Sequence, residues 1–509
     1  MTNPDDQQGL ADNCLQDQTE YLAGKKLIIC ANRAPFQFEK TPEDEYTYER
    51  GSGGLVTALL GLTQNIDATW IACAQSSADR ELESVHVPLD QNNPDRTIHI
   101  KFLSPTIEAY EGYYNIIANP LLWFLQHSMW DVPTSPIINR DTWHAWDNGY
   151  RTVNELFARA IIEQTRENQG ASLVMLQDYH LYLAARRVRD SLPPRARPTL
   201  LHFIHIPWPG SEYWQILPPN MRFSILDSLC AVDILGFQTK DDGLNFIRTC
   251  ESFLPKSHVN FKHGRIWYRN HATYVRDFPI SIDVDSIQNQ VHSPEVEEYR
   301  SEIETNTAGH KVIVRVDRIE PSKNIVRGFL AFEELLDLHP EHCGEVQFLA
   351  YLVPSRMGVE EYNEYLDKIN ATAGRVNAKY GDSDWEPVRV IIGENYERAL
   401  AALQLYDVLL VNAIADGMNL VAKEGPIINQ KDGVLILSER AGAKQQLGVG
   451  AIVIPPCDVY ATAESMHQAL TMSEPEKKEK SRHLKWIIEK EDIVDWLCRQ
   501  LQTIEELGL

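Results

Sequence analysis

Short runs of apolar, often β-branched residues alternate along the chain with longer segments whose apolar residues recur every three or four positions. Most of the short runs are largely apolar instead of alternating apolar with polar residues, which is typical of strands covered on both faces. Predicted strands of this kind are 27–30, 173–176, 200–204, 232–236, 312–316, 346–352, 388–392, 408–411 and 434–437. Because helical segments separate many of them, the pattern predicts an α/β fold with parallel, doubly wound sheets.

The predicted strands fall into two sets, separated by a long polar stretch that begins after Ile282. We therefore expect two Rossmann-like domains, 25–283 and 284–485, that face each other across a cleft. The polar and acidic residues 1–24 are expected to form a disordered tail. Residues 486–509 have a helical pattern, and we expect this C-terminal helix to pack back on the first domain.

The composition limits the kinds of partner that the chain can bind. A formal net charge of −24 over 509 residues disfavours nucleic acid and anionic membranes, so anionic ligands must be bound by individually placed arginines and lysines. No apolar run reaches membrane-spanning length, and the first residues lack the pattern of a signal peptide. The eight cysteines contain no C-x-x-C pair, so we expect reduced thiols in a cytoplasmic protein, with neither a zinc site nor a disulfide framework.

Two cations follow a predicted strand in the segment VIVRVDRIEPSKN. Arg318 comes at the end of the strand, and Lys323 lies in the turn before a helix whose N-cap we expect to be Ser322. Ligands of open α/β sheets bind at the carboxyl ends of strands, and helix N-termini favour anions. The position therefore predicts a diphosphate site, although such a pair of cations is more often simply solvated.

The segment ADGMNLVAKEGP follows another predicted strand. Asp416 and Gly417 come just past this strand, and Glu424 is expected on the helix that follows. Carboxylates in these positions can accept hydrogen bonds from sugar and ribose hydroxyls. The structural alternative, an Asp-Gly turn and a surface glutamate, stays open for this segment taken alone.

A glycine-rich loop in the segment ERGSGGLVTALLGL precedes an apolar helical run. Backbone N–H groups around Gly53 and Gly54 could approach a phosphate closely. The spacing is not the G-x-G-x-x-G of dinucleotide-binding proteins, so an ordinary turn is the alternative.

Polar residues also end two strands in the first half of the chain. Asp178 and His205 each lie just beyond an apolar run, which fits the lining of a cleft better than two isolated core residues. Asp283 and Asp285 spell the D-x-D motif that binds metal in some sugar transferases, but they open the polar linker, and we assign no metal to them.

Taken together, the ordered segments of this chain resemble the trehalose-6-phosphate synthase family from about residue 26 to the C-terminal helix. The segments that carry the resemblance are ANRAPF, GSGGL, YYNIIANPLLW, QDYHL, HIPWP, DILGFQT, DRIEPSK, PSRMGVEEY and DGMNLVAKE. The resemblance implies a GT-B fold with the active site between the domains. It also implies transfer of glucose from a nucleoside diphosphate to glucose 6-phosphate, giving α,α-trehalose 6-phosphate with retention of configuration and no metal or other cofactor.

The resemblance also implies roles for individual residues. The implied acceptor-binding residues are Arg33, Tyr114 and Arg356 for the phosphate, Trp123 as pocket lining and Asp178 for hydroxyls. The implied donor-binding residues are Gly53, Gly54, Arg318, Lys323, Asp416, Gly417, Met418, Asn419, Leu420, Val421, Ala422, Lys423 and Glu424. The implied catalytic residues are Arg318 and Lys323 on the diphosphate, and His205 and Asp416 on the transferred sugar. The partners would be small molecules, and the protein could be a homo-oligomer.

The chain departs from the family pattern in four places. Ala415 stands where the family usually has arginine, and Asn324 stands where it usually has glycine. The segment Trp70–Cys73 lacks a second tryptophan, and HIPWPGSEYW replaces the usual form of that motif. The donor base and the acceptor therefore stay open. The alternatives are a pseudo-glycosyltransferase that joins cyclitols, as in validoxylamine 7'-phosphate synthesis, another acceptor, or a non-catalytic sugar-phosphate-binding regulator.

Overall fold

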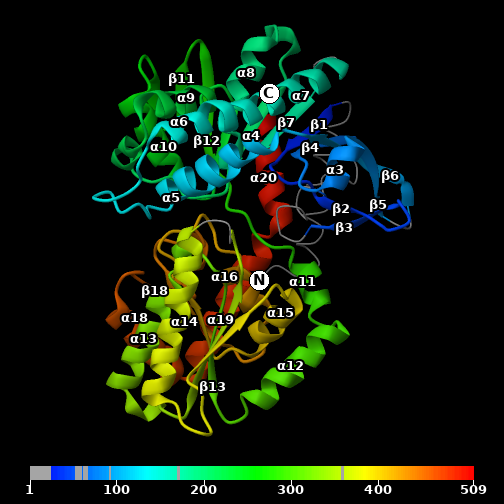
Figure 1. The fold of residues 1–509 in the computed structure, drawn as a ribbon. Helices are drawn as coiled ribbons and strands as arrows, with labels where there is room; N and C mark the ends of the chain where they lie inside the picture. Colours follow the sequence, from blue (N-terminus) through cyan, green and yellow to red (C-terminus); the bar gives the residue numbers. More distant parts are fainter. Residues whose placement is uncertain (1–24, 52–59, 61–66, 91–92, 169–171, 357–359) are drawn as a thin grey trace. The chain divides into compact units, whose positions relative to one another are not determined.

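The computed structural model describes residues 25–51, 60, 67–90, 93–168, 172–356 and 360–509 (Figure 1). The chain forms two compact units. The first unit contains the described residues up to Phe278 together with Val494–Leu509, and the second contains Pro279–Ile493. The predicted tail 1–24 lies outside the described residues, and the cleft expected between the domains stays a prediction.

The first unit is built on a ten-stranded sheet in the order β10-β11-β12-β9-β8-β7-β1-β4-β6-β5. Its strands are β1 (Lys26–Cys30), β4 (Ala68–Cys73), β5 (Ser84–Asp90), β6 (Asn93–Leu103), β7 (Ser172–Gln177), β8 (Thr199–Ile204), β9 (Ile234–Phe237), β10 (His258–Asn260), β11 (Arg265–Tyr268) and β12 (His271–Asp277). From β12 to β6 neighbouring strands are parallel, while β5, β10 and β11 add antiparallel pairs at the two edges. A separate hairpin pairs β2 (Phe36–Lys40) with β3 (Tyr46–Arg50).

Helices connect these strands. They are α3 (Ser77–Leu82), α4 (Ile107–Glu111), α5 (Trp123–Gln126), α6 (Arg140–His144), α7 (Arg151–Glu167), α8 (Ala184–Ser191), α9 (Pro219–Leu229) and α10 (Lys240–Phe253). Two π-helical segments, η1 (Gly112–Leu122) and η2 (Ala145–Tyr150), and three short 3₁₀ turns, η3 (Tyr179–Leu181), η4 (Pro194–Ala196) and η5 (Ser211–Ile216), complete the connections.

The second unit has a six-stranded sheet, all parallel, in the order β15-β14-β13-β16-β17-β18. Its strands are β13 (Lys311–Arg318), β14 (Val346–Val353), β15 (Val388–Ile392), β16 (Val408–Val411), β17 (Val434–Ser438) and β18 (Ile452–Ile454). The other elements of this unit are α11 (Val284–Gln290), α12 (Pro294–Asn306), η6 (Pro321–Lys323), α13 (Ile325–Leu338), η7 (Pro340–His342), α14 (Glu360–Tyr380), α15 (Tyr396–Leu405), α16 (Val421–Ile428), α17 (Lys444–Leu447), α18 (Val459–Thr471) and α19 (Glu474–Lys490). The last helix, α20 (Ile493–Glu506), belongs to the first unit from Val494 onward.

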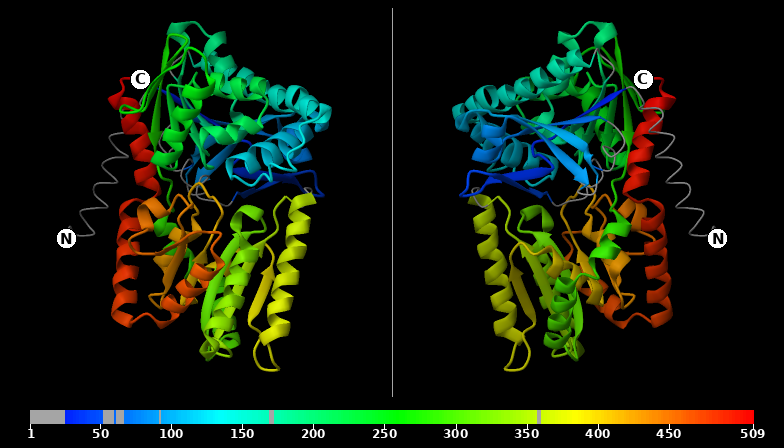
Figure 2. Two further views of the ribbon diagram at one scale, coloured as in Figure 1. Left: turned by 90° about the vertical axis from the view of Figure 1, so that its left-hand side faces the viewer. Right: turned by 90° about the vertical axis from the view of Figure 1, so that its right-hand side faces the viewer.

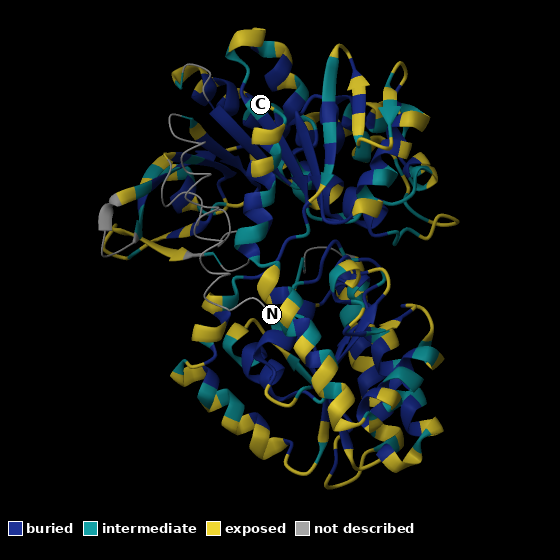
Figure 3. Cartoon of the chain, turned by 180° about the vertical axis from the view of Figure 1, so that it is seen from behind, coloured by how far each residue is buried: buried dark blue, intermediate teal, exposed yellow. Residues whose placement is uncertain are grey.

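Helices cover both faces of this second sheet (Figure 2). On one face α13, α14 and α18 close an apolar core, in which Phe329 and Phe332 pack against Phe348 of β14 with ring centroids 5.3 and 5.4 Å apart. On the other face α12, α15, α16 and α19 pack side by side. The strands are buried and the outward faces of the helices are exposed (Figure 3), as a doubly wound sheet requires.

The α/β class with parallel, doubly wound sheets is confirmed, and every strand that the apolar runs predict is present within a residue or two. The strands that the sequence pattern missed are β2 to β6, β10 to β12 and β18. Of these, β5, β10 and β18 are edge strands, which have a paired neighbour on one side only and need not be apolar on both faces.

The C-terminal helical pattern forms two helices instead of the one expected over 486–509. α19 ends at Lys490 and α20 begins at Ile493. The backbone N–H of Ile493 donates to the carbonyl of Ile282 at 3.1 Å, which removes it from the helical hydrogen-bond ladder. α20 then continues in the first unit, where Trp496 lies edge-on to Phe203 with ring centroids 5.3 Å apart.

The cysteines agree with the expectation of reduced thiols except at one position. Cys30, Cys73, Cys230 and Cys250 are buried and free, as expected, and two further described cysteines are free and exposed. Cys498, in contrast, is disulfide-bonded, so the expectation that every thiol is reduced is wrong. Among the described residues, no helix is both long and apolar enough to cross a membrane.

Candidate functional site

The carboxyl edge of the second sheet carries an ion pair between two residues that the sequence singled out. Lys323 lies in the turn η6 after β13, and Asp416 follows β16. The Lys323 Nζ and Asp416 Oδ2 atoms are 2.5 Å apart, and the two side chains are only 13% and 15% exposed. Burial acts against the charged form of Lys323, but the carboxylates of Asp416 and Asp317 outweigh it and raise its pKa. Lys323 is therefore a fixed cation at neutral pH.

A fully buried arginine holds the turn that carries Lys323. Arg315 of β13 pairs with Asp317 at 2.7 Å and donates through Nη2 to the carbonyl of Lys323 at 2.9 Å. Gly328 of α13 leaves the space for this guanidinium, since a Cβ there would lie 2.5 Å from Arg315 Nη1. The position of Lys323 is thus set from inside the unit before any ligand binds.

The turn ends at Asn324, one of the departures from the family pattern. Asn324 has a φ of +59°, in the left-handed region that favours glycine or asparagine. Its amide donates to the carbonyls of Asn412 at 2.9 Å and Pro456 at 2.6 Å. Asn324, and not Ser322, is therefore the residue that precedes α13. The expected Ser322 cap is wrong because Ser322 lies inside η6, where its hydroxyl donates to Oε2 of Glu320 at 3.4 Å.

We expect Asn324→Ala to lower the free energy of unfolding by about 2 to 3 kcal/mol, because it loses two buried hydrogen bonds and places alanine at a positive φ. Asn324→Gly serves as the control, since glycine tolerates this φ while lacking the side-chain bonds. The glycine variant should be about 1 kcal/mol more stable than the alanine variant in denaturant unfolding. Equal losses would show that the backbone conformation contributes nothing.

A buried glutamate brings together two arginines that the sequence assigned to different substrates. Glu320 is fully buried, and its Oε1 lies 3.1 Å from Arg318 Nη1 and 3.3 Å from Arg356 Nη1. Ser355 also donates to this oxygen at 3.3 Å, and Arg356 donates to the hydroxyl of Tyr362 at 2.6 Å. Glu320 thus positions both guanidinium groups. No pattern in the sequence distinguishes Glu320 from other glutamates, although it lies inside the segment DRIEPSK.

The segment after β16 links the Asp416 carboxylate to the start of α16. Asn419, at a φ of +75°, donates to Asp416 Oδ2 at 3.1 Å and accepts from the N–H of Ala422 at 3.2 Å. The backbone of Asp416 and Met418 is fixed in turn by bonds to Arg440, Gly442 and Ala443. The predicted donor residues from Asp416 to Glu424 therefore form one rigid loop and the first turn of α16.

Two charged side chains of this loop behave differently. Lys423 is buried and its Nζ donates to the carbonyl of Ile280 at 2.8 Å, which gives this side chain a structural role. Glu424 lies in the first turn of α16, where burial raises its pKa to about 7. A carboxylate with this pKa changes its charge near neutral pH, and the ribose contact implied for Glu424 stays a prediction.

In the first unit, Asp178 and His205 meet at the carboxyl ends of β7 and β8. The Asp178 Oδ1 atom accepts from the backbone N–H of His205 at 3.1 Å, and Asp178 has a φ of +67°. The His205 Nε2 atom lies 2.9 Å from Oε1 of Gln177, which the sequence analysis did not single out. Burial and the neighbouring His202 lower the pKa of His205 to about 3, so its imidazole is neutral at pH 7. The positive φ of Asp178 is a strained backbone conformation, and such conformations are often found at functional sites.

The other predicted acceptor residues lie on aromatic layers of the first unit. Tyr114, in the π-helical segment η1, stacks between Tyr110 and His180 with centroids 5.5 and 5.9 Å apart. π-helical turns are rare and are frequent at functional sites. Arg33 is exposed after β1, and its carbonyl accepts from the indole N–H of Trp70 at 3.1 Å.

Trp123 is more enclosed than the predicted pocket lining would suggest. Its ring stacks on His127 with centroids 4.0 Å apart and is only 6% exposed. A ligand could therefore touch only a small part of this ring. Gly53 and Gly54, the predicted donor-loop glycines, lie outside the described residues.

Each unit thus gathers a group of the predicted residues. The donor group, in the second unit, contains Arg318, Lys323, Asp416 and Glu424, and Arg356 lies with it. The first unit contains the predicted acceptor residues Arg33, Tyr114, Trp123 and Asp178, together with His205, which is predicted to contact the transferred sugar. The donor group has three cations, Arg318, Lys323 and Arg356, at the carboxyl edge of an open sheet, which suits an anionic leaving group.

Comparisons with known proteins identify relatives over most of the chain. The family model "Glycosyltransferase family 20" matches residues 25–506. The alpha,alpha-trehalose-phosphate synthase [UDP-forming] of Schizosaccharomyces pombe is 32% identical over 89% of this chain and 85% of its own length. A probable UDP-forming synthase of Arabidopsis thaliana is 32% identical over 90% of this chain, which spans only 54% of that relative's length.

Solved structures show the same fold. The Escherichia coli protein bound with UDP-2-fluoro glucose has a TM-score of 0.79 at 27% identity, covering 92% of this chain and 97% of that chain. The Burkholderia xenovorans synthase in complex with glucose-6-phosphate has a TM-score of 0.78 at 25% identity, covering 94% and 100%. The family predicted from the ordered motifs is confirmed, and so is the fold class.

Proposed function

Since this chain belongs to glycosyltransferase family 20, we propose that it transfers glucose from UDP-glucose to glucose 6-phosphate. The products would be UDP and α,α-trehalose 6-phosphate. The relatives named as UDP-forming trehalose-phosphate synthases, and the similar structures bound with UDP-2-fluoro glucose and with glucose-6-phosphate, support both substrates.

The observation that carries the proposal is the cationic group at the carboxyl edge of the second sheet. In the reaction the bond between the glucose C1 atom and the diphosphate oxygen breaks, and the leaving diphosphate gains negative charge. Arg318 and Lys323 are held there by Glu320, Asp416 and the buried Arg315 before the substrate arrives. Cations fixed in advance stabilise charge that develops in the transition state more than charge already present in the ground state.

The proton and the bond changes balance without a further reactant. A C1–O bond forms to the acceptor's C1 hydroxyl, whose proton passes to the leaving phosphate oxygen on the same face of the sugar. This front-side course retains the donor's configuration and needs no carboxylate pair of the hydrolase kind. We propose that no metal takes part, because Arg318 and Lys323 supply the positive charge. His205, neutral at pH 7, can exchange a hydrogen bond with the transferred sugar but carries no charge into the site.

The assay that tests the proposal mixes purified protein with UDP-, GDP- or ADP-glucose and with glucose 6-phosphate, other sugar phosphates or an aminocyclitol phosphate. We expect UDP release that requires glucose 6-phosphate, with α,α-trehalose 6-phosphate identified by mass and NMR. Coupling through nitrogen to the aminocyclitol would favour the cyclitol alternative instead. Tight binding of glucose 6-phosphate without UDP release from any donor would favour the non-catalytic regulator.

The raised pKa of Glu424 predicts a pH dependence of donor binding. If the ionised carboxylate accepts hydrogen bonds from both ribose hydroxyls, its protonation below a pKa of about 7 removes acceptor capacity. The KM for UDP-glucose should therefore rise as the pH falls from about 8 to about 6, roughly tenfold over that range. The matched control is Glu424→Gln, whose KM should be high and nearly flat over the same pH range. An unchanged pH profile in this variant would contradict a ribose contact by Glu424.

A further inference from the structure

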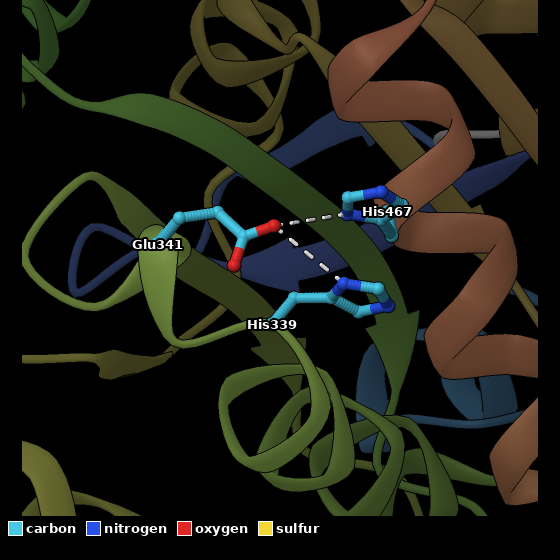
Figure 4. A group of neighbouring side chains, drawn as sticks. All are labelled: His339, Glu341 and His467. Atoms are coloured by element: carbon cyan, nitrogen blue, oxygen red, sulfur yellow. Dashed lines mark ion pairs between the residues drawn. The ribbon is translucent and has the colours of Figure 1, made fainter.

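Two histidines and a glutamate meet in the second unit, away from the donor group. His339 follows the last residue of α13, Glu341 lies in the short turn η7, and His467 lies on α18 (Figure 4). The carboxylate of Glu341 faces both imidazoles, with its Oε1 atom 3.6 Å from His339 Nδ1 and 3.9 Å from His467 Nδ1. One ligand-type atom from each of the three residues lies within 4.8 Å of the others.

These separations are close to those of atoms bound to one metal ion. Zinc–nitrogen and zinc–oxygen bonds of about 2.0 to 2.2 Å in a tetrahedral site place neighbouring ligand atoms about 3.3 Å apart. The separations of 3.6 and 3.9 Å therefore need to shrink by about half an ångström. Glu341 is exposed and lies on a short turn, so its side chain can make this movement without disturbing the core.

A second carboxylate sets the tautomer of His339. Its Nε2 atom lies 2.9 Å from Oε1 of Glu464, which is on α18 one turn before His467. An ionised carboxylate only accepts hydrogen bonds, so in the neutral imidazole the ring proton belongs on Nε2 and the Nδ1 atom presents its lone pair to Glu341. Two lone-pair atoms facing each other repel unless a proton or a metal ion lies between them. A carboxylate on the outer nitrogen of a liganding histidine is the usual arrangement around protein-bound metals.

A third histidine adjoins the cluster. The Nε2 atom of the buried His342 lies 3.0 Å from Nδ1 of His467, at the separation of two ligand atoms on one ion. If His467 Nδ1 binds a metal it can no longer share a proton with His342, which leaves the His342 nitrogen available as a fourth ligand. The rings of His339 and His467 stack with centroids 3.6 Å apart, so one of them must tilt to direct both nitrogens at one point.

We propose that His339, Glu341 and His467 bind a divalent transition-metal ion, with Zn²⁺ the best match, and that Glu464 positions His339. Two neutral imidazoles and one carboxylate suit Zn²⁺ better than Mg²⁺ or Ca²⁺, which prefer oxygen ligands. The carboxylates of Glu341 and Glu464 together carry negative charge, which the proposed divalent ion would neutralise. The ion would link the end of α13 to α18, two helices that pack on the same face of the sheet.

The position of the cluster assigns the ion a structural role. His339 and Glu341 lie between the end of α13 and the start of β14, at the amino edge of the sheet. Lys323 and Asp416 lie at the carboxyl edge, where parallel α/β sheets bind their substrates. The metal should therefore affect the stability of the second unit and not the chemistry of glucose transfer. This inference is independent of the proposed function.

The experiment uses the full chain without a histidine tag, stripped with a chelator and titrated with ZnCl₂ by calorimetry, and with Co²⁺ followed by visible absorption. We expect one saturable Zn²⁺ site with a Kd of about 1 µM or lower, and a cobalt spectrum of tetrahedral type. Glu341→Gln and His467→Gln should each weaken binding by at least about 100-fold, and Glu464→Gln by about 10- to 100-fold. Saturating Zn²⁺ should raise the Tm of the second unit by roughly 5 °C with kcat unchanged.

The matched control is His86→Gln in the first unit, since exposed His86 also stacks on another histidine, His99, with centroids 4.7 Å apart. This variant should bind Zn²⁺ like the unaltered protein. Because Glu341 is exposed, Glu341→Gln removes a ligand without a risk to folding, so a loss of binding in it cannot be a folding defect. The proposal is overturned if no saturable binding occurs below about 100 µM Zn²⁺, or if Glu341→Gln and His467→Gln both bind as well as the His86→Gln control.

Discussion

Arg318→Ala is expected to lower kcat for glucose transfer by about 100- to 1,000-fold, while the KM for the donor changes by less than about tenfold. The reason is that the diphosphate gains its charge as the glycosidic bond breaks, so this arginine contributes more to the transition state than to the bound donor. Steady-state kinetics with UDP-glucose and glucose 6-phosphate, with UDP release as the readout, measure both constants.

The structure shows why this variant should still fold. The Arg318 side chain is 46% exposed, and the buried carboxylate of Glu320 keeps Arg356 as a partner at 3.3 Å when Arg318 is removed. The matched control is Arg375→Ala, which removes an exposed arginine paired with Glu333 on α13 of the same unit and should leave both constants unchanged. A raised KM with kcat unchanged in Arg318→Ala would mean that Arg318 binds the donor equally in the ground state and the transition state, and would contradict a role in stabilising the leaving diphosphate.

Lys323→Met should reduce kcat/KM by about 1,000-fold or more and also lower the free energy of unfolding by about 2 kcal/mol. The loss of activity follows from the missing cation at the diphosphate. The loss of stability follows because the Asp416 carboxylate, only 15% exposed, loses its ion pair with Lys323 while it retains the amide of Asn419 at 3.1 Å. Kinetics and denaturant unfolding of the same preparation measure the two effects.

A second substitution separates the two effects of Lys323. In the double variant Lys323→Met/Asp416→Asn no charge is left unpaired, so most of the lost stability should return while activity stays low. Because Asp416 is itself predicted to contact the transferred sugar, the reference for activity is Asp416→Asn alone. If the double variant is as active as Asp416→Asn, Lys323 acts only by supporting the fold. If the single variant keeps full activity, the diphosphate is bound elsewhere.

Glu320 gives the donor group a property that two separate arginines would lack. A fully buried carboxylate costs free energy unless it is paired, and here it is paired with both Arg318 and Arg356. Each guanidinium is thus directed by the same oxygen atom, and little reorganisation is needed when an anion arrives. Arg356, predicted to bind the acceptor phosphate, and Arg318, predicted to bind the donor diphosphate, are therefore positioned by the same glutamate, Glu320.

The sequence by itself determined the class of the fold and the identity of the family. Apolar runs such as those of β13 and β16 predicted buried parallel strands, because a strand covered on both faces has no polar side. The residues just after these strands, Arg318 and Asp416, were singled out because the carboxyl ends of parallel strands meet at one edge. Ordered motifs from about residue 26 to the C-terminal helix then identified the family, which the family model over residues 25–506 confirms.

The tertiary structure alone decided which of these residues meet, and how. Glu320 joins Arg318 to Arg356, which is far along the chain, and His339 meets His467 across two helices. The positive φ of Asn324 explains a departure from the family pattern that the sequence could only note. Contacts of this kind depend on strand register, burial and helix packing between distant segments, and local periodicity contains none of that information.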